Sequence, residues 1–208
     1  IQELFRLERK DAFQKFVELL MAQSGGIFEA SRFASPCGVS RMTILNYLRV
    51  LEATYVVHVI RPFSTRRATE IIAAPKTYGF DTGFVCYHRG WESLRQEDMG
   101  LLWEHFVLNE LQAQLQTRNI LYWRDKQGHE IDFILPRRGK SPTAVECKWS
   151  VTGFDPRNFL TFHRAYPSSE CFAVCHDVQR SFVRKFSGLP VKFLSLPSLV
   201  HEFIKPGH

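Results

Sequence analysis

Two short segments of alternating polar and apolar residues constrain the fold of this chain most strongly. They read EIDFIL at residues 130–135 and AVECK at residues 144–148. Alternation with a period of two is typical of a β-strand that has one face buried. Residues 136–142, between the two segments, contain two prolines and a glycine, which predicts a turn. We therefore expect two neighbouring strands joined by a short connection.

The charged residues of these strands form the candidate site. Glu146 and Lys148 are two residues apart and share one face of their strand, and the turn can bring Asp132 beside them. Converging carboxylates repel each other unless a cation neutralises them, and hard oxygen ligands favour Mg²⁺ or Mn²⁺. Lys148 would then orient a water, or help to deprotonate it, for attack on a phosphodiester. The motif alone also fits an exposed hairpin with cross-strand ion pairs.

The order of the neighbouring elements favours a buried site over an exposed hairpin. Periodicity predicts an α-β-β-β-α-β order, with these elements: a helix at 100–116, strands at 120–124, 130–135 and 143–149, a helix at 156–165 and a strand at 171–175. A fifth strand at 191–194 and a helix at 198–204 are expected to follow. Arg124, at the end of the first strand, is a candidate phosphate contact or a solvated charge.

The N-terminal part of the chain has a different pattern. It predicts these elements in order: a helix at 11–23, a short helix at 30–34, a turn at 36–40, a helix capped by Ser40, and strands at 55–60, 71–74 and 76–80. Two helices joined by a glycine turn and followed by paired strands are typical of a winged helix-turn-helix. Asp81, Thr82 and Gly83 are expected to open a connector after the paired strands. We place this domain, with its leading helix and connector, at residues 1–90, and the second domain at residues 91–208.

A winged helix suggests nucleic-acid contact, with DNA favoured. The candidate contact residues are polar or basic and lie on the second helix or in the predicted wing: Arg41, Thr43, Asn46, Arg66 and Arg67. The net charge of +6 agrees with an anionic partner. Winged helices also serve as protein–protein spacers, and the sequence leaves that alternative open.

Composition limits the cellular setting and the other ligands. Five cysteines at irregular spacing predict free thiols in a reducing compartment, hence a cytoplasmic protein, and no apolar run reaches the length of a membrane span. Cys171 and Cys175 suggest core packing rather than a zinc site. The sequence GKS at 139–141 lacks the first glycine of a phosphate-binding loop, so we expect no ATP site in this chain.

Residues 100–150 resemble the PD-(D/E)xK nuclease superfamily. Asp132 matches the motif aspartate, and Glu146 and Lys148 match the ExK pair. Glu104 matches the supplementary acid of the first helix. Ile131 stands where the motif has its proline. The resemblance implies an α/β fold in which a winged helix-turn-helix precedes a PD-(D/E)xK nuclease-like domain, and a possible Mg²⁺-dependent nuclease.

Further blocks are similar to the domain-of-unknown-function-4143 family over nearly the whole chain. They include LEATYVVHVIRPF, GLLWEHFVLNEL, YWRDKQGHEIDFIL and VECKWS. The resemblance implies the C-terminal part of an AAA+ ATPase whose AAA+ domain lies upstream, and a chain that begins with Ile1 agrees with this expectation. A non-catalytic region that binds nucleic acid or protein on a nuclease-like scaffold is the alternative.

Overall fold

The structure is a computed structural model that describes residues 9–64, 74–137 and 139–204. It is a mixed α/β protein with one two-stranded and one six-stranded sheet. The chain divides into two compact units, of which the first comprises residues 1–60 and 74–94 and the second residues 61–73 and 95–208. Residues 61–64 therefore group with the second unit. Each unit is described by itself.

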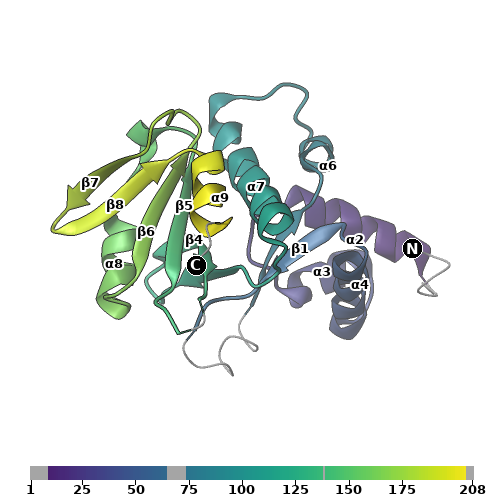
Figure 1. Cartoon of the computed structure of the whole chain (residues 1–208). Coiled ribbons are helices and arrows are strands. Elements are labelled where there is room, and N and C mark those ends of the chain that lie inside the picture. The colour runs from purple at the N-terminus through teal and green to yellow at the C-terminus, as the bar shows by residue number, and fades with distance from the viewer. Residues whose placement is uncertain (1–8, 65–73, 138, 205–208) are drawn as a thin grey trace. The chain divides into compact units, whose positions relative to one another are not determined.

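The N-terminal unit packs helices around a small sheet (Figure 1). Its elements are α2 (Lys10–Ala22), α3 (Ala30–Cys37), α4 (Arg41–Ala53), β1 (Val57–Ile60), β2 (Lys76–Gly79) and α6 (Thr82–His88). Phe16 of α2 is fully buried, and its ring packs against the rings of Phe28, Phe33 and Tyr47. This aromatic cluster joins α2 to α3 and α4.

The α3–α4 connection follows from local chemistry. Gly38 has a φ of +64°, a left-handed conformation that ends α3 and that glycine adopts at little cost. Ser40 then caps α4, because its Oγ accepts the backbone N–H of Thr43 at 3.1 Å. After α4, β1 and β2 pair antiparallel, and Ile27 forms an isolated antiparallel bridge with Lys76 of β2. Most of the strand predicted at 71–74 lies outside the described residues.

The segment after β2 corrects one prediction. We expected a connector from Asp81 onward, but residues 82–88 form the helix α6. Asp81 starts this helix, because its Oδ1 accepts the backbone N–H groups of Gly83 at 2.7 Å and Phe84 at 3.3 Å. Asp and Gly are common turn residues, so the sequence around Asp81 and Gly83 predicted a turn. The structure shows that Asp81 caps a helix instead.

The C-terminal unit is built on the six-stranded sheet, in the order β3-β4-β5-β6-β8-β7. Its elements are α7 (Gln96–Leu115), β3 (Leu121–Arg124), β4 (Glu130–Leu135), β5 (Thr143–Lys148), the 3₁₀ turn η1 (Val151–Gly153), α8 (Arg157–Ala165), β6 (Glu170–Cys175), β7 (Phe182–Phe186), β8 (Leu189–Leu194) and α9 (Leu196–Ile204). Strands β5, β6 and β8 run parallel, and the other neighbouring pairs are antiparallel.

Helices cover both faces of this sheet. Phe159 and Phe162 of α8 pack with Ile131, Ala144 and Cys171 on one face. Helices α7 and α9 pack against β5, β6 and each other on the opposite face (Figure 1). Alternation along β5 therefore directs Ala144, Glu146 and Lys148 toward α8. The six-residue bounds predicted for β4 agree with the structure.

Two elements of this unit differ from the prediction. Strand β7 was not expected, because its five residues are largely exposed and lack apolar alternation. It pairs with β8 through a tight turn in which Ser187 and Gly188 both have positive φ, as a two-residue hairpin requires. Helix α7 begins at Gln96 rather than Gly100, because Asp98 accepts the backbone N–H of Arg95 at 2.9 Å and stabilises the first turn.

Candidate active site

Asp132 lies where strands β4 and β5 separate. The last pair in their ladder is Phe133 with Val145, and one further step in the same register places Asp132 opposite Glu146. The pairing between β3 and β4 also shifts here, as at a β-bulge. Asp132 Oδ2 accepts the backbone N–H of Cys147 at 2.8 Å, so a side chain takes the place of a ladder carbonyl. This bond holds the carboxylate between the two strands.

Glu146 is the buried centre of the cluster. Its side chain is only 1% exposed, and its two oxygens have separate partners. Oε2 lies 2.9 Å from Lys148 Nζ, and Oε1 accepts a hydrogen bond from Asn158 Nδ2 at 3.0 Å. An exposed hairpin would leave this carboxylate in water, so the burial argues against the simple cross-strand ion pair.

The charges of the three residues are coupled. Burial, reinforced by the charge of Asp132, raises the pKa of Glu146 to about 7, although Lys148 and Asn158 act in the opposite direction. Burial also disfavours the charge on Lys148, but the carboxylates of Asp132 and Glu146 outweigh it and raise the pKa of Lys148 above its ordinary value. The cluster thus holds a protonated lysine beside two carboxylates that repel each other.

Glu104 reaches the neighbourhood from α7, which packs on the face of β5 opposite Glu146. The pKa of the buried Cys147 thiol is raised well above its ordinary value, first by burial and then by the charges of Asp132 and Glu104. Glu104 therefore lies within electrostatic range of the strand that carries the site. Asp132, held between β4 and β5, lies near Glu146 and Lys148 on one face of β5 and near Cys147 on the other.

The donor set fits a hard divalent cation, although not a fully protein-coordinated one. Among the residues that the structure describes, no group of three or more histidine, cysteine, aspartate or glutamate side chains is arranged to hold a metal ion. Mg²⁺ is commonly held by one or two carboxylates and keeps several waters. Asp132 and Glu146 would supply two such carboxylates, and Glu146 would exchange its contact with Lys148 or Asn158 for the ion.

Arg124 does not join this cluster. Its Nη1 lies 3.5 Å from Glu130 Oε2 across the β3–β4 pair, and its side chain is 45% exposed. The strand-end position was predicted, and the ion pair with Glu130 was not. Arg66 and Arg67, the predicted wing contacts, lie outside the described residues.

The predicted contacts on α4 differ in their availability. Arg41 and Asn46 are exposed, and Asn46 Oδ1 accepts a hydrogen bond from Arg49 at 3.2 Å. Thr43 is half-buried, and its hydroxyl lies 2.9 Å from Ser40 Oγ. Thr43 thus contributes to the start of the helix, while Arg41 and Asn46 face solvent.

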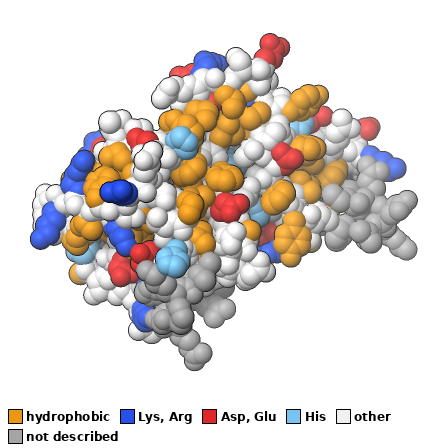
Figure 2. All heavy atoms as spheres, turned by 45° about the horizontal axis from the view of Figure 1, so that its top comes forward, with side chains coloured by type: hydrophobic (Ala, Val, Ile, Leu, Met, Phe, Trp, Pro, Cys, Tyr) orange, Lys and Arg blue, Asp and Glu red, His pale blue; other side chains and the backbone are white. Residues whose placement is uncertain are grey.

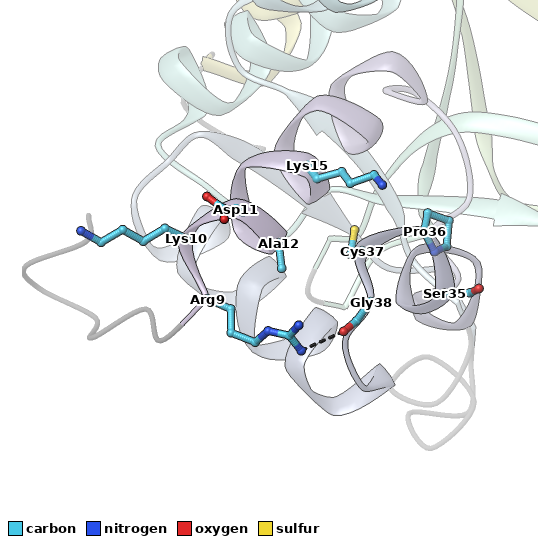
Figure 3. A pocket seen from close by; sticks show the side chains of 9 residues that line it. All are labelled: Arg9, Lys10, Asp11, Ala12, Lys15, Ser35, Pro36, Cys37 and Gly38. Atoms are coloured by element: carbon cyan, nitrogen blue, oxygen red, sulfur yellow. Dashed lines mark hydrogen bonds between the residues drawn. The ribbon is translucent and has the colours of Figure 1, made fainter.

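A pocket of about 720 Å³ in the same unit was not predicted. It lies between the start of α2 and the end of α3, and its lining includes Arg9, Lys10, Lys15 and Asp11 (Figure 3). Arg9 Nη1 donates a hydrogen bond to the carbonyl of Gly38 at 2.8 Å. Basic side chains are otherwise interspersed with acidic and apolar ones on the face that Figure 2 shows. The pocket lining thus carries three basic side chains and one acidic side chain.

Sequence reasoning missed the site residues that come from other elements. Asn158 binds Glu146 from α8, and no sequence pattern marks an amide on an amphipathic helix as a carboxylate partner. His176 stacks on Trp149, next to Lys148.

Cys171 and Cys175 are free and buried, which confirms the expected core packing. None of the described helices combines the length and apolarity that a membrane-spanning segment needs.

Two family models match different parts of the chain. Residues 99–194 match the domain of unknown function DUF4143. The similarity to that family is thus confirmed for the part that contains Asp132, Glu146 and Lys148. Residues 1–95 instead match a second domain of unknown function, DUF8612, so the expected extent of the DUF4143 similarity was too wide.

Two curated relatives and one solved assembly are similar to this chain. Uncharacterized proteins Rv2008c of Mycobacterium tuberculosis and Mb2031c of Mycobacterium bovis are each 29% identical over 138 residues, which cover 64% of this chain and 31% of theirs. The match thus spans about a third of the relatives' length. An assembly of Thermococcus gammatolerans McrB AAA+ hexamers with bound McrC matches over 86% of this chain and 46% of its own, at 12% identity and a TM-score of 0.35. That likeness carries no conclusion.

Proposed function

We propose that the C-terminal unit is a metal-dependent nuclease module of the PD-(D/E)xK type. The observation that carries the proposal is the cluster of fully buried Glu146 with half-buried Lys148 and Asp132, at the ends of β5 and β4 that lie side by side. Burying a charged cluster costs free energy, so a cluster with no function would be unfavourable on an otherwise apolar sheet. The α-β-β-β-α-β order of α7, β3, β4, β5, α8 and β6 supports the same proposal.

Each residue of the cluster has a distinct part in this proposal. A divalent ion held by Asp132 and Glu146 would polarise the phosphodiester and lower the pKa of a bound water. Lys148 keeps its proton at neutral pH because its pKa is raised, so it orients the water or the phosphate rather than acting as a base. Asn158 fixes the Glu146 carboxylate through Oε1. Glu104 adds negative charge from the opposite side of β5.

We further propose that the N-terminal unit is a winged helix-turn-helix that contacts DNA. The order of α2, α3, α4 and the β1–β2 pair supports the fold, as does the bridge from Ile27 to β2. Exposed Arg41 at the start of α4 supports phosphate contact, and Arg9 and Lys10 lie near Gly38, three residues before it. Arg66 and Arg67, as wing contacts, and Arg124 of the second unit remain proposed contacts.

The resemblance to the DUF4143 family also suggests that the chain is the C-terminal part of an AAA+ ATPase. The match covers only 31% of each curated relative, so those proteins extend well beyond it. In this proposal the AAA+ domain of the same polypeptide is the partner, and this chain supplies the nuclease and DNA-contact modules. The alternative is a non-catalytic regulatory region that keeps the nuclease scaffold without turnover.

Cleavage assays test the catalytic proposal. The wild-type chain is expected to cut DNA or RNA oligonucleotides with Mn²⁺ or Mg²⁺ and not with EDTA. Glu146→Ala and Lys148→Ala should each lower the rate roughly 100-fold or more, as expected for loss of a group that acts on the transition state. Lys126→Ala, an exposed lysine in the β3–β4 turn, is the matched control and should retain activity. Cleavage that persists in both site variants would contradict the proposal, and metal binding without cleavage would favour the regulatory alternative.

A further inference from the structure

An aromatic stack lies beside the candidate site at the end of the same strands. Strands β5 and β6 are parallel, with Lys148 opposite Cys175. The next residue on each strand is aromatic: Trp149 after Lys148 and His176 after Cys175. Their rings are stacked, with centroids 3.9 Å apart and planes 11° from parallel. The register of the two strands thus stacks the two rings face to face where the strands end, so that only the outer face of each ring can meet a ligand.

Neighbouring groups hold this stack in place. Trp103 of α7 packs edge-on against both rings, with centroid distances of 6.1 Å to Trp149 and 5.8 Å to His176. Trp103 is itself fixed, because its Nε1 donates a hydrogen bond to the carbonyl of Val174 at 3.0 Å. Asp177, which follows His176, accepts hydrogen bonds from Ser150 Oγ at 2.7 Å and from the backbone N–H of Val151 at 3.0 Å. The segments after both rings are therefore tied together.

The stack is accessible and close to the acidic cluster. His176 is exposed, and Trp149 is half-buried. Successive residues of a strand point to opposite faces, so Lys148 projects toward α8 and Trp149 projects toward α7. The charged cluster and the aromatic stack thus occupy the two sides of one strand end. A polynucleotide that crosses this end would meet a phosphate-binding side and a base-binding side one residue apart.

We propose that Trp149 and His176 form a stacking platform for a nucleobase next to the phosphodiester that Lys148 would contact beside Glu146. This inference rests on the proposed nuclease function and adds its substrate class, which is a nucleic acid with unpaired bases. A base within a duplex has both faces covered by its neighbours, whereas an unpaired base exposes a face that an aromatic ring can stack upon. The module would therefore favour single strands, flaps or looped nucleotides over continuous duplex.

Base-dependent binding tests the platform separately from cleavage. The probe is a fluorescent single-stranded oligodeoxynucleotide, compared by anisotropy with an abasic strand of equal length, using the full chain in EDTA. Stacking on one base contributes about 1–3 kcal/mol, so Trp149→Ala should weaken binding of the base-containing strand roughly 5- to 140-fold. It should leave the abasic strand within about twofold, because phosphate contacts remain.

Three further variants make this experiment discriminating. Trp149→Phe keeps an aromatic face and should retain most of the base-dependent affinity. His176→Ala removes the exposed ring and should lower the base-dependent affinity, as Trp149→Ala does. Phe182→Ala alters a second stacked pair, Phe182 on Phe193, on the far edge strand β7 and should have no effect. Circular dichroism checks that each variant is folded.

The outcomes separate the platform from the nuclease proposal. Three outcomes would each overturn the platform. The first is an equal loss of affinity for base-containing and abasic strands, and the second is no loss of affinity in Trp149→Ala and His176→Ala. The third is no oligonucleotide binding by the wild type. Base-dependent binding that is lost in the Trp149 variant supports it, even if the wild type shows no metal-dependent cleavage. Cleavage by the wild type, together with base-dependent binding that is unchanged in Trp149→Ala, would overturn the platform and leave the nuclease proposal intact.

Discussion

The candidate site residues of the two units differ in how they handle charge. The C-terminal unit buries Glu146 at 1% side-chain exposure and pairs it with Lys148, at a cost in desolvation. The N-terminal unit keeps its candidate contacts, such as Arg41 and Asn46, in solvent, where a charge costs little. A buried charge needs a structural or functional reason, and an exposed one needs none. The burial of Glu146 therefore makes the C-terminal cluster the stronger candidate for a functional site.

The pH dependence of stability should show the largest difference between the units. The pKa of Glu146 is raised from 4.5 to about 7, so the folded state binds a proton more tightly than the unfolded state. The resulting stability is fully present below pH 4.5 and is lost as the pH rises through 7, a loss of about 3 kcal/mol. Urea denaturation in EDTA between pH 4.5 and 8.5 should show this fall in wild type and a flatter profile in Glu146→Gln.

Glu29→Gln is the matched control in the N-terminal unit. Glu29 is 43% exposed and pairs with Arg32 on the surface, so this substitution should leave the pH profile close to that of wild type. Equal profiles for wild type and Glu146→Gln would show that the buried carboxylate does not control stability. The contrast between the units would then fail.

Removal of one cation from each unit should give the next largest difference. Lys148→Ala removes the cation that lowers the pKa of Glu146, so the buried carboxyl must either stay charged without its partner or take up a proton at pH 8. Both outcomes cost free energy, and the free energy of unfolding should fall by about 2–3 kcal/mol, less than for a fully buried pair because Lys148 is 29% exposed. Arg32→Ala removes a surface pair and should cost less than about 1 kcal/mol. Urea titrations of both variants at pH 8 make the comparison, and equal costs would contradict it.

A smaller effect is expected from the cap that starts α4. Ser40→Ala removes the acceptor for the backbone N–H of Thr43 and should destabilise the N-terminal unit by about 1 kcal/mol. Ser35→Ala, an exposed serine within α3, should have little effect. Thermal denaturation followed by circular dichroism measures both. An equal response would show that the α3–α4 connection does not depend on this cap.

The smallest effect should be on DNA affinity. Arg41→Ala should weaken binding a few-fold and lower the slope of log affinity against log salt by about 1, as for loss of one phosphate contact. Arg32→Ala, an exposed arginine of α3 already paired with Glu29, should leave the slope unchanged. An unchanged slope in Arg41→Ala would remove α4 from the proposed interface.

The sequence predicted the strand hairpin and its charges because their pattern is local. Apolar alternation marks β4, and residues 146 and 148 share a face by spacing alone. It could not predict Asn158 or the Trp149–His176 stack, because these contacts join β5 to α8 and to β6 across the fold. It also missed β7, whose exposed edge position removes the apolar alternation that marks a strand.

Calorimetric titration with Mn²⁺ tests the central claim, that Asp132 and Glu146 form a divalent-cation site, most directly. The wild-type chain should bind one ion, and Asp132→Asn and Glu146→Gln, which keep the shape of each side chain, should each weaken binding roughly tenfold or more. Asp155→Asn, an acidic residue paired with Arg157 outside the cluster, should bind Mn²⁺ like wild type. No Mn²⁺ binding by the wild type, even with an oligonucleotide present, or equal binding by all four proteins, would contradict the account.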